Sequence, residues 1–158
     1  MMPGDSLTNL YYEDIEIGQT ISTHAHRVTM DDVRTFADVT RDHHPLHTDE
    51  AYCKTTVYGR PIAHGLYGLS LIEGLKTELK LYETTSFGSL GWDKVRFRAP
   101  IYPGDCVRVR MRFVSKRKSK TPGRGIVVEA IELVNQDGAV VTEAEHASLL
   151  MTRSPSAA

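Results

Sequence analysis

The chain has 158 residues, of which 41% are hydrophobic and 25% are charged, so it can bury the core of one ordinary globular domain. The formal net charge of −1 excludes a general attraction to nucleic acid or acidic membranes, and no run approaches the ~18 apolar residues of a membrane-spanning helix. The two cysteines exclude a disulfide framework, and the first residues lack the basic and apolar regions of a secretion signal, so we expect a reducing, cytoplasmic location.

The first regular elements are predicted to be a strand and a short helix. Thr20–Val28 can run as a strand after the break at Gly18. Thr29 can then cap a helix, with Asp32 three residues later as the acidic partner of a capping box. The apolar residues of this helix recur on one face, and the pattern ends near Arg41.

Two prolines divide the next part of the chain. Pro45 interrupts helical continuation, so residues 42–47 are predicted to form a turn, and Thr48 begins another short helical turn. A long helix is predicted to follow Pro61, because proline is favoured at a first helical position. Its apolar residues step by three or four positions, as in a core-facing stripe: Ile62, Leu66, Leu69, Ile72, Leu75 and Leu79. Three glycines indicate that neighbouring backbone comes close: Gly65, Gly68 and Gly74.

The second half of the chain is predicted to be strands. Apolar and polar residues alternate, or apolar runs are bounded by turn residues, in four segments: 94–99, 107–113, 126–135 and 139–151. One long helix followed by antiparallel strands indicates an α+β fold. We expect one domain over residues 10–152, with flexible ends at residues 1–9 and 153–158.

The first candidate for chemistry is the pair Asp42 and His47, which lie five residues apart across Pro45. A carboxylate and an imidazole held by a rigid turn can share proton transfer, as the addition of water to a double bond requires. The alternative is that Asp42 caps a turn and His47 is a surface imidazole. The spacing alone leaves both interpretations open.

The second candidate is the step His64-Gly65 near the start of the long helix. Backbone N–H groups there lack intrahelical acceptors, so they can stabilise the negative charge that develops on a thioester oxygen. A glycine would let the thioester approach without a Cβ in the way. The alternative is that Gly65 only relieves crowding between the helix and a strand.

Two other interpretations of the polar residues are less well supported. His43, His44 and His47, with Asp42 and Asp49, could suggest a metal, but Pro45 prevents the helical spacing of metal-binding histidines, so we expect no metal. The arginine-rich strands could suggest RNA, but aromatic stacking residues are sparse, so we expect no nucleic acid. Lys118 and Arg124 are instead candidates for binding the phosphates of coenzyme A or a carrier protein, although a plain polar loop is the alternative.

Four linked motifs give the chain a resemblance to the MaoC-like (R)-specific enoyl-CoA hydratases of the hot-dog superfamily. Residues 12–18 are similar to the opening aromatic-Glu-Asp segment of the family, and residues 36–49 to its Phe-Ala-…-Asp-x-Asn-Pro-x-His-x-Asp signature. Residues 59–65 are similar to its Pro-Ile-x-His-Gly step, and residues 97–105 to its Phe-…-Pro-…-Gly-Asp turn. The resemblance implies a sheet wrapped around a long helix, in a homodimer or a dimer of dimers. It also implies that Asp42 and His47 are catalytic and that the Gly65 N–H is the oxyanion donor.

The activity implied by the resemblance is syn hydration of a trans-2-enoyl thioester to the (R)-3-hydroxyacyl thioester, and the reverse, without a cofactor. The carrier would be coenzyme A or acyl carrier protein, with no membrane involved. His44 stands where the family has asparagine, so we count His44, Pro45 and His64 with Lys118 and Arg124 among the substrate-binding residues. The alternatives are a non-catalytic hot-dog protein that binds acyl thioesters or a partner protein, and a hot-dog thioesterase.

Overall fold

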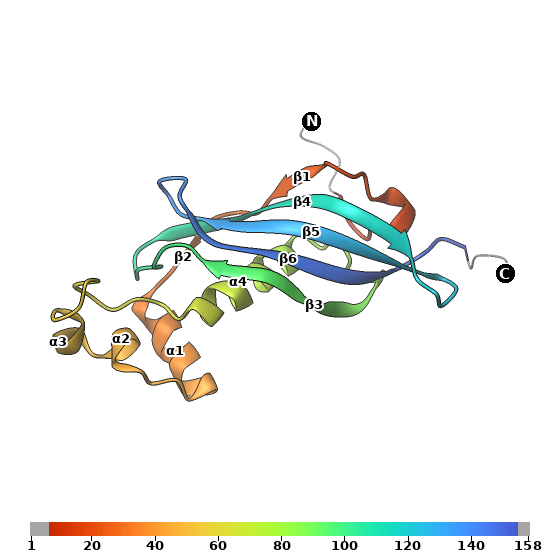
Figure 1. The fold of residues 1–158 in the computed structure, drawn as a ribbon. Coiled ribbons are helices and arrows are strands. Elements are labelled where there is room, and N and C mark those ends of the chain that lie inside the picture. The colour runs from red at the N-terminus through yellow and green to blue at the C-terminus, as the bar shows by residue number, and fades with distance from the viewer. Residues whose placement is uncertain (1–6, 155–158) are drawn as a thin grey trace.

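The computed structural model describes residues 7–154, and its main feature is an antiparallel sheet that covers one long helix (Figure 1). The strands in this part of the chain are β1 (Thr20–Ser22), β2 (His26–Arg27), β3 (Ser86–Phe97), β4 (Cys106–Lys118), β5 (Arg124–Val134) and β6 (Val140–Met151). The helical segments are η1 (Tyr12–Asp14), α1 (Met30–Thr40), α2 (Pro45–Thr48), α3 (Glu50–Cys53) and α4 (Gly65–Glu78).

The sheet has the strand order β1-β4-β5-β6-β3, and β2 also pairs with β4. All of these pairings are antiparallel, as the short turns between β4, β5 and β6 allow. The long helix α4 crosses one face of the sheet, and α1, α2 and α3 lie beyond one end of it (Figure 1). This arrangement confirms the expected α+β hot-dog fold.

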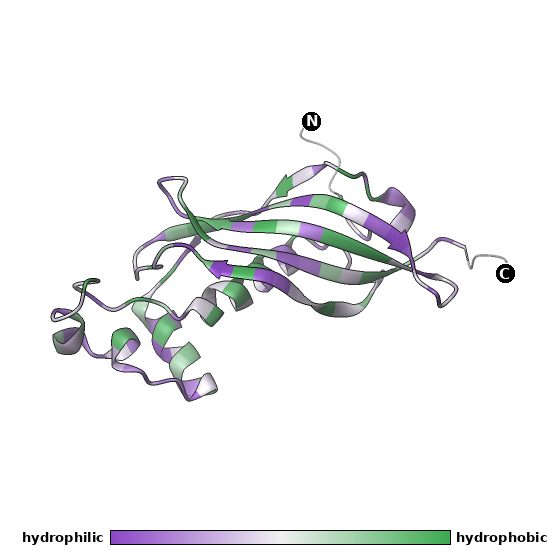
Figure 2. Cartoon of the chain, viewed as in Figure 1, coloured by the Kyte–Doolittle hydropathy of each residue, from purple (hydrophilic) through white to green (hydrophobic). Residues whose placement is uncertain are grey.

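Buried residues alternate with more exposed ones along β4 and β5, and the buried ones form the core. Val107, Val109, Met111 and Phe113 are buried on one face of β4, and the residues between them are exposed or partly exposed. Figure 2 shows this alternation of hydrophobic and hydrophilic residues along the strands. The buried face packs with Ile72 of α4 and other apolar residues in one cluster, so burial fixes the register of the sheet. No helix in the described part of the chain is long and apolar enough to cross a membrane.

The start of the long helix was predicted four residues too early. Ile62 and Ala63 are extended, because their N–H groups donate to the carbonyls of Leu46 and Ile101, and the helix begins at Gly65. Leu66 is 60% exposed, so its place in the core-facing stripe was also wrong.

Two of the three helix glycines meet close neighbours. A Cβ added to Gly68 would lie 2.8 Å from the Ile101 side chain, and one added to Gly65 would meet Phe97 equally closely. These neighbours are side chains and not the backbone that the sequence led us to expect. Nothing lies within 4 Å of such an atom on Gly74, so the expected close approach was wrong there.

Other boundaries differ from the expectations in detail. The predicted strand at residues 20–28 is interrupted at 23–25, and β3 begins at Ser86 and is bulged, without a clean alternation of buried residues. Asn9 donates from its N–H to Lys80 and accepts from Thr84, so ordered contacts begin before residue 10. The ends expected to be flexible, residues 1–9 and 153–158, fall largely on residues 1–6 and 155–158, which lie outside the described part of the chain, and the domain boundaries stay a prediction.

Candidate active site

The end of α1 brings Asp42 into position. The capping box at the start of this helix is confirmed, since Thr29 accepts from the Asp32 N–H and the Asp32 carboxylate accepts from the Thr29 N–H. At the other end Arg41 adopts a left-handed conformation with φ 67°, which turns the chain out of the helix. Asp42 follows this reversal directly, and its carboxylate accepts a hydrogen bond from the His44 N–H at 3.3 Å.

The segment after Asp42 is a short helix and not the predicted turn. Pro45 is the first residue of α2, and His44 is its cap, with the ring Nδ1 accepting from the Leu46 N–H at 3.2 Å. Proline suits this position because the missing N–H would have no intrahelical acceptor. An asparagine side chain caps helices in the same way. His44 therefore performs a local role that asparagine, which the family has here, can also perform.

His47 lies on α2 with its ring in a defined orientation. Its Nδ1–H donates to the Ile62 carbonyl at 2.7 Å, so in the neutral ring Nε2 is the free acceptor. Burial lowers the pKa of His47, and the nearby His64 and His44 act in the same direction. The Ile62 carbonyl and Asp42 act to raise that pKa but do not outweigh the burial. His47 is therefore a neutral base at neutral pH.

His64, the cap of α4, connects Asp42 and His47. Its Nε2–H donates to the Asp42 backbone carbonyl at 2.9 Å, and its ring stacks on the His47 ring with centroids 3.7 Å apart. The side chain is buried, and its Nδ1 is the one buried side-chain nitrogen or oxygen without a hydrogen-bond partner among the described residues. Buried acceptors are normally hydrogen-bonded, so we expect a donor such as a water molecule at this Nδ1.

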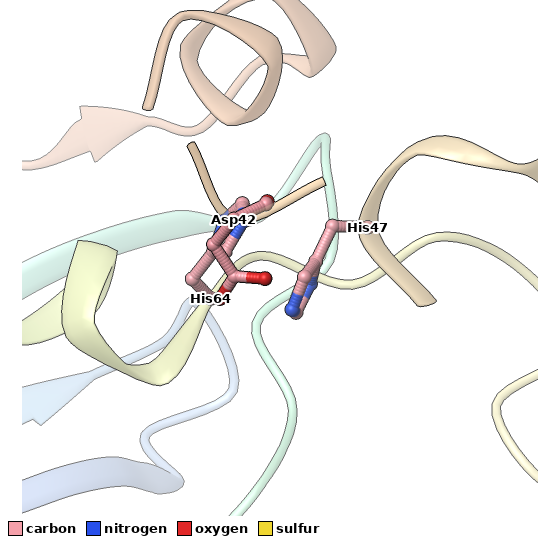
Figure 3. A group of neighbouring side chains, drawn as sticks. All are labelled: Asp42, His47 and His64. Carbon is pink, nitrogen blue, oxygen red and sulfur yellow. The ribbon is translucent and has the colours of Figure 1, made fainter. Parts of the chain in front are cut away.

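Asp42, His47 and His64 form one polar group from three segments. One ligand-type atom from each lies within 4.8 Å of the others, and the Asp42 carboxylate points toward the His47 ring (Figure 3). Such spacing suits a shared water molecule, and two imidazoles with a carboxylate also suit a metal ion. Of the residues that suggested a metal in the sequence, Asp42 and His47 belong to this group, whereas His43 lies 3.7 Å from Asp38 and does not join it. The expectation of no metal stays a prediction.

Gly65 begins α4 beside a cavity. As the first helical residue, it has an N–H without an intrahelical acceptor, and the His64 side chain does not cap it. A cavity of about 240 Å³ is lined by residues that include Gly65, Ile62, Phe97 and Thr142. Asp42 and His47 do not line it, but Ile62, whose carbonyl holds His47, does. The candidate oxyanion donor therefore lines this cavity, whereas the candidate base is connected to it only through the Ile62 carbonyl.

Two of the expected phosphate-binding residues lie elsewhere. Lys118 ends β4 and Arg124 begins β5, at the end of the sheet opposite α1, α2 and α3 (Figure 1). Arg124 lies over the Phe87 ring, 4.4 Å from its centroid. One protomer therefore does not bring these side chains to Asp42, and their role in binding phosphates stays a prediction.

Comparison with known proteins gives a family match over most of the chain. The model of the MaoC like domain matches residues 14–135. A 3-hydroxybutyryl-CoA dehydratase of Methylorubrum extorquens is 36% identical over 112 residues, which cover 70% of this chain and 67% of that protein. An (R)-specific enoyl-CoA hydratase of Rhodospirillum rubrum is 31% identical over 142 residues, which cover 81% of this chain and 92% of that protein.

A solved structure agrees with the fold over nearly the whole length. The chain is similar to a monoamine oxidase regulatory protein of Archaeoglobus fulgius, with a TM-score of 0.86 and 32% identity. The match covers 93% of this chain and 97% of that one. The shared fold therefore includes both the sheet and the helical segments that carry the candidate site.

Proposed function

The chain belongs to the MaoC-like dehydratase family, and from this premise we propose that it interconverts a trans-2-enoyl thioester and its (R)-3-hydroxyacyl thioester. The observation that carries the proposal is the grouping of Asp42, His47 and His64 within 4.8 Å beside the first N–H of α4. These residues supply a base, a carboxylate that stabilises its protonated form, and a second acceptor for the water, next to an oxyanion donor. Coenzyme A is the proposed carrier, since the two enzymes above are named for CoA substrates.

In the proposed hydration, one water molecule lies between the three side chains. His47 Nε2 takes one of its protons, and the orphaned Nδ1 of His64 accepts its other O–H. The Asp42 carboxylate stabilises the positive charge that forms on His47. The water oxygen bonds to the β-carbon while the electron pair of the double bond moves onto the thioester oxygen. The Gly65 N–H donates to that oxygen.

The second half of the cycle returns the proton. The His47 imidazolium, stabilised by the Asp42 carboxylate, delivers the proton to the α-carbon on the face where the water was added. The enolate collapses back to the thioester, and the enzyme regains its starting state. Hydration is then syn, and dehydration follows the same steps in reverse.

A homodimer is the assembly that we propose for this chain. Strand β3 lies at the edge of the sheet, and among the described strands it pairs with β6 alone. Phe87, Leu90 and Phe97 on this strand are each about half exposed. An apolar edge strand of this kind is covered by pairing with a second copy, which removes its unpaired N–H and carbonyl groups from water.

The test is the loss of enoyl-thioester absorbance with trans-2-enoyl-CoA substrates, for the wild type and Asp42→Asn. We expect turnover by the wild type and a loss of 10²–10⁴-fold, roughly the value of acid–base catalysis, in the variant. Asp42 is exposed, so the variant should fold normally. Release of free thiol would identify a thioesterase instead, and binding without turnover of CoA or carrier-protein thioesters would identify a binding protein.

A further inference from the structure

A polar cavity lies beside the C-terminal half of α4, away from the Asp42 group. It has a volume of about 290 Å³, and ten of its eleven lining residues are polar, with Leu81 as the exception. Lys76 of α4 and His146 and Ser148 of β6 are buried in its wall. The proposed catalytic steps use none of these residues. A polar cavity against the central helix is unexpected in a protein proposed to hold an acyl chain.

The wall of this cavity is an ordered network. The Lys76 ammonium lies 2.6 Å from the Glu129 carboxylate, which also accepts from the Tyr82 hydroxyl at 2.7 Å. Nδ1 of His146 lies 3.1 Å from the Lys76 ammonium and 3.4 Å from the Glu129 carboxylate. Because the ammonium is nearer and can only donate, we assign this Nδ1 as the acceptor. The Nε2–H of His146 then donates to the Ser89 hydroxyl at 2.7 Å. The Ser89 O–H proton stays available for a ligand.

The polar cavity lies on the same face of the sheet as the cavity at Gly65. Thr142 of β6 lines the first cavity and lies 3.3 Å from the Cβ position of Gly68, whereas His146 of β6 meets Lys76. Along β6 the two contacts are four residues apart, which is about 13 Å of strand. Along α4 they are eight residues apart, which is about 12 Å of helix. The helix α4 and the strand β6 therefore extend side by side, over similar lengths, from one cavity toward the other.

The proposed function anchors a thioester at Gly65, and the following inference rests on it. We propose that the distal end of the acyl chain lies in the polar cavity and carries a neutral oxygen group, such as a hydroxyl. An alkyl end would remove water from Ser89 and Ser148 without replacing its hydrogen bonds. A carboxylate is disfavoured, because Glu73 and Glu83 line the cavity and the Lys76 ammonium is already paired with Glu129.

The first experiment measures kcat/KM for three trans-2-enoyl-CoA substrates of about ten carbons, a length comparable to the roughly 12 Å of helix between Gly68 and Lys76. One has a plain chain, one a terminal hydroxyl and one a terminal carboxylate. We expect the hydroxylated chain to be preferred at least about tenfold over the other two. Turnover of the plain chain with equal or greater efficiency would overturn the inference while leaving the proposed function intact.

Matched serine variants test whether the cavity produces the preference. In Ser89→Ala the preference for the hydroxylated chain should fall to about threefold or less, because the hydroxyl that faces the ligand is gone. Ser115→Ala, an exposed serine on β4, should retain the wild-type preference. An unchanged preference in Ser89→Ala would place the selectivity elsewhere and overturn the assignment.

Trp92 provides a signal that does not depend on turnover. It is the one tryptophan of the chain, and its ring lies 4.3 Å from that of His146. Titration of full-length Asp42→Asn with the three thioesters, followed by Trp92 fluorescence, should show about tenfold tighter binding of the hydroxylated chain. Equal binding of all three overturns the inference. Preferential binding together with no wild-type turnover supports the cavity but contradicts the proposed hydratase.

Discussion

The imidazole of His64 stacks on that of His47 with ring centroids 3.7 Å apart, and its Nε2–H donates to the Asp42 carbonyl. One buried side chain thus touches both proposed catalytic residues. It fixes the plane of the base and the backbone of the carboxylate residue together. This contact depends on the extended segment before α4, which places His64 under the short helix α2.

His64→Gln separates the two roles of this side chain. A glutamine amide can reach the Asp42 carbonyl as Nε2–H does, but it leaves no acceptor at the place of Nδ1. We expect kcat to fall about 10–100-fold with little change in KM, because the reacting water loses a partner. His43→Gln changes an exposed histidine outside the group and serves as control. Wild-type kcat in His64→Gln would exclude a role for Nδ1.

The activity should depend on pH through His47. Burial lowers the pKa of this imidazole, so its neutral form persists below the ordinary value of about 6.5. We expect kcat/KM to be constant near neutral pH and to fall only below about pH 6.5, measured by enoyl-thioester absorbance. An acid limb centred above this value would contradict a neutral base in a buried position.

The free energy of unfolding should also depend on pH through His47, and the direction of this dependence can be predicted. Below about pH 6.5 the unfolded chain binds a proton at this histidine more readily than the folded chain does, so the free energy of unfolding falls as pH decreases. Above that value the contribution is constant. His47→Gln should flatten this part of the curve from urea unfolding, and an unchanged slope would show that other groups dominate it.

His44 can be tested as a helix cap. His44→Asn should keep the free energy of unfolding within a few tenths of a kcal/mol, because asparagine also caps, whereas His44→Ala should lose about 1 kcal/mol. Urea unfolding measures both. If His44 also contacts substrate, as the sequence led us to expect, His44→Asn will shift the preference for acyl groups at unchanged stability. Equal stability of the two variants would argue against the cap.

Local chemistry predicted much of this structure. The Thr29–Asp32 capping box and the alternation along β4 depend on residues near in sequence, and both are present as expected. Asp42, His47 and Gly65 lie in continuous motifs, so they could be chosen as candidates from the sequence, and their catalytic roles stay a prediction. The start of α4 was not predicted correctly, since the hydrogen bonds that keep Ile62 and Ala63 extended come from Leu46 and Ile101.

The polar network at the C-terminal end of α4 was not predicted from the sequence. Lysine is normally a solvent-facing residue, yet Lys76 is buried against Glu129, which is 53 positions away along the chain. Charged residues are almost never fully buried unless paired, and such a pairing appears only in the folded chain. The unpartnered Nδ1 of His64 was hidden in the same way, because it depends on the contact with Asp42.

The last prediction concerns Gly65, where packing and function can be separated. In Gly65→Ala the new Cβ would lie 2.8 Å from the Phe97 ring, so we expect lower stability and lower activity. Phe97 is 53% exposed, and in the double variant Gly65→Ala/Phe97→Ala the clash is gone, so thermal unfolding should return to that of Phe97→Ala. If the thioester must approach the Gly65 N–H, activity will stay low in the double variant, because the methyl group still blocks this approach. Recovery of the kcat/KM of Phe97→Ala would show that the glycine serves only packing.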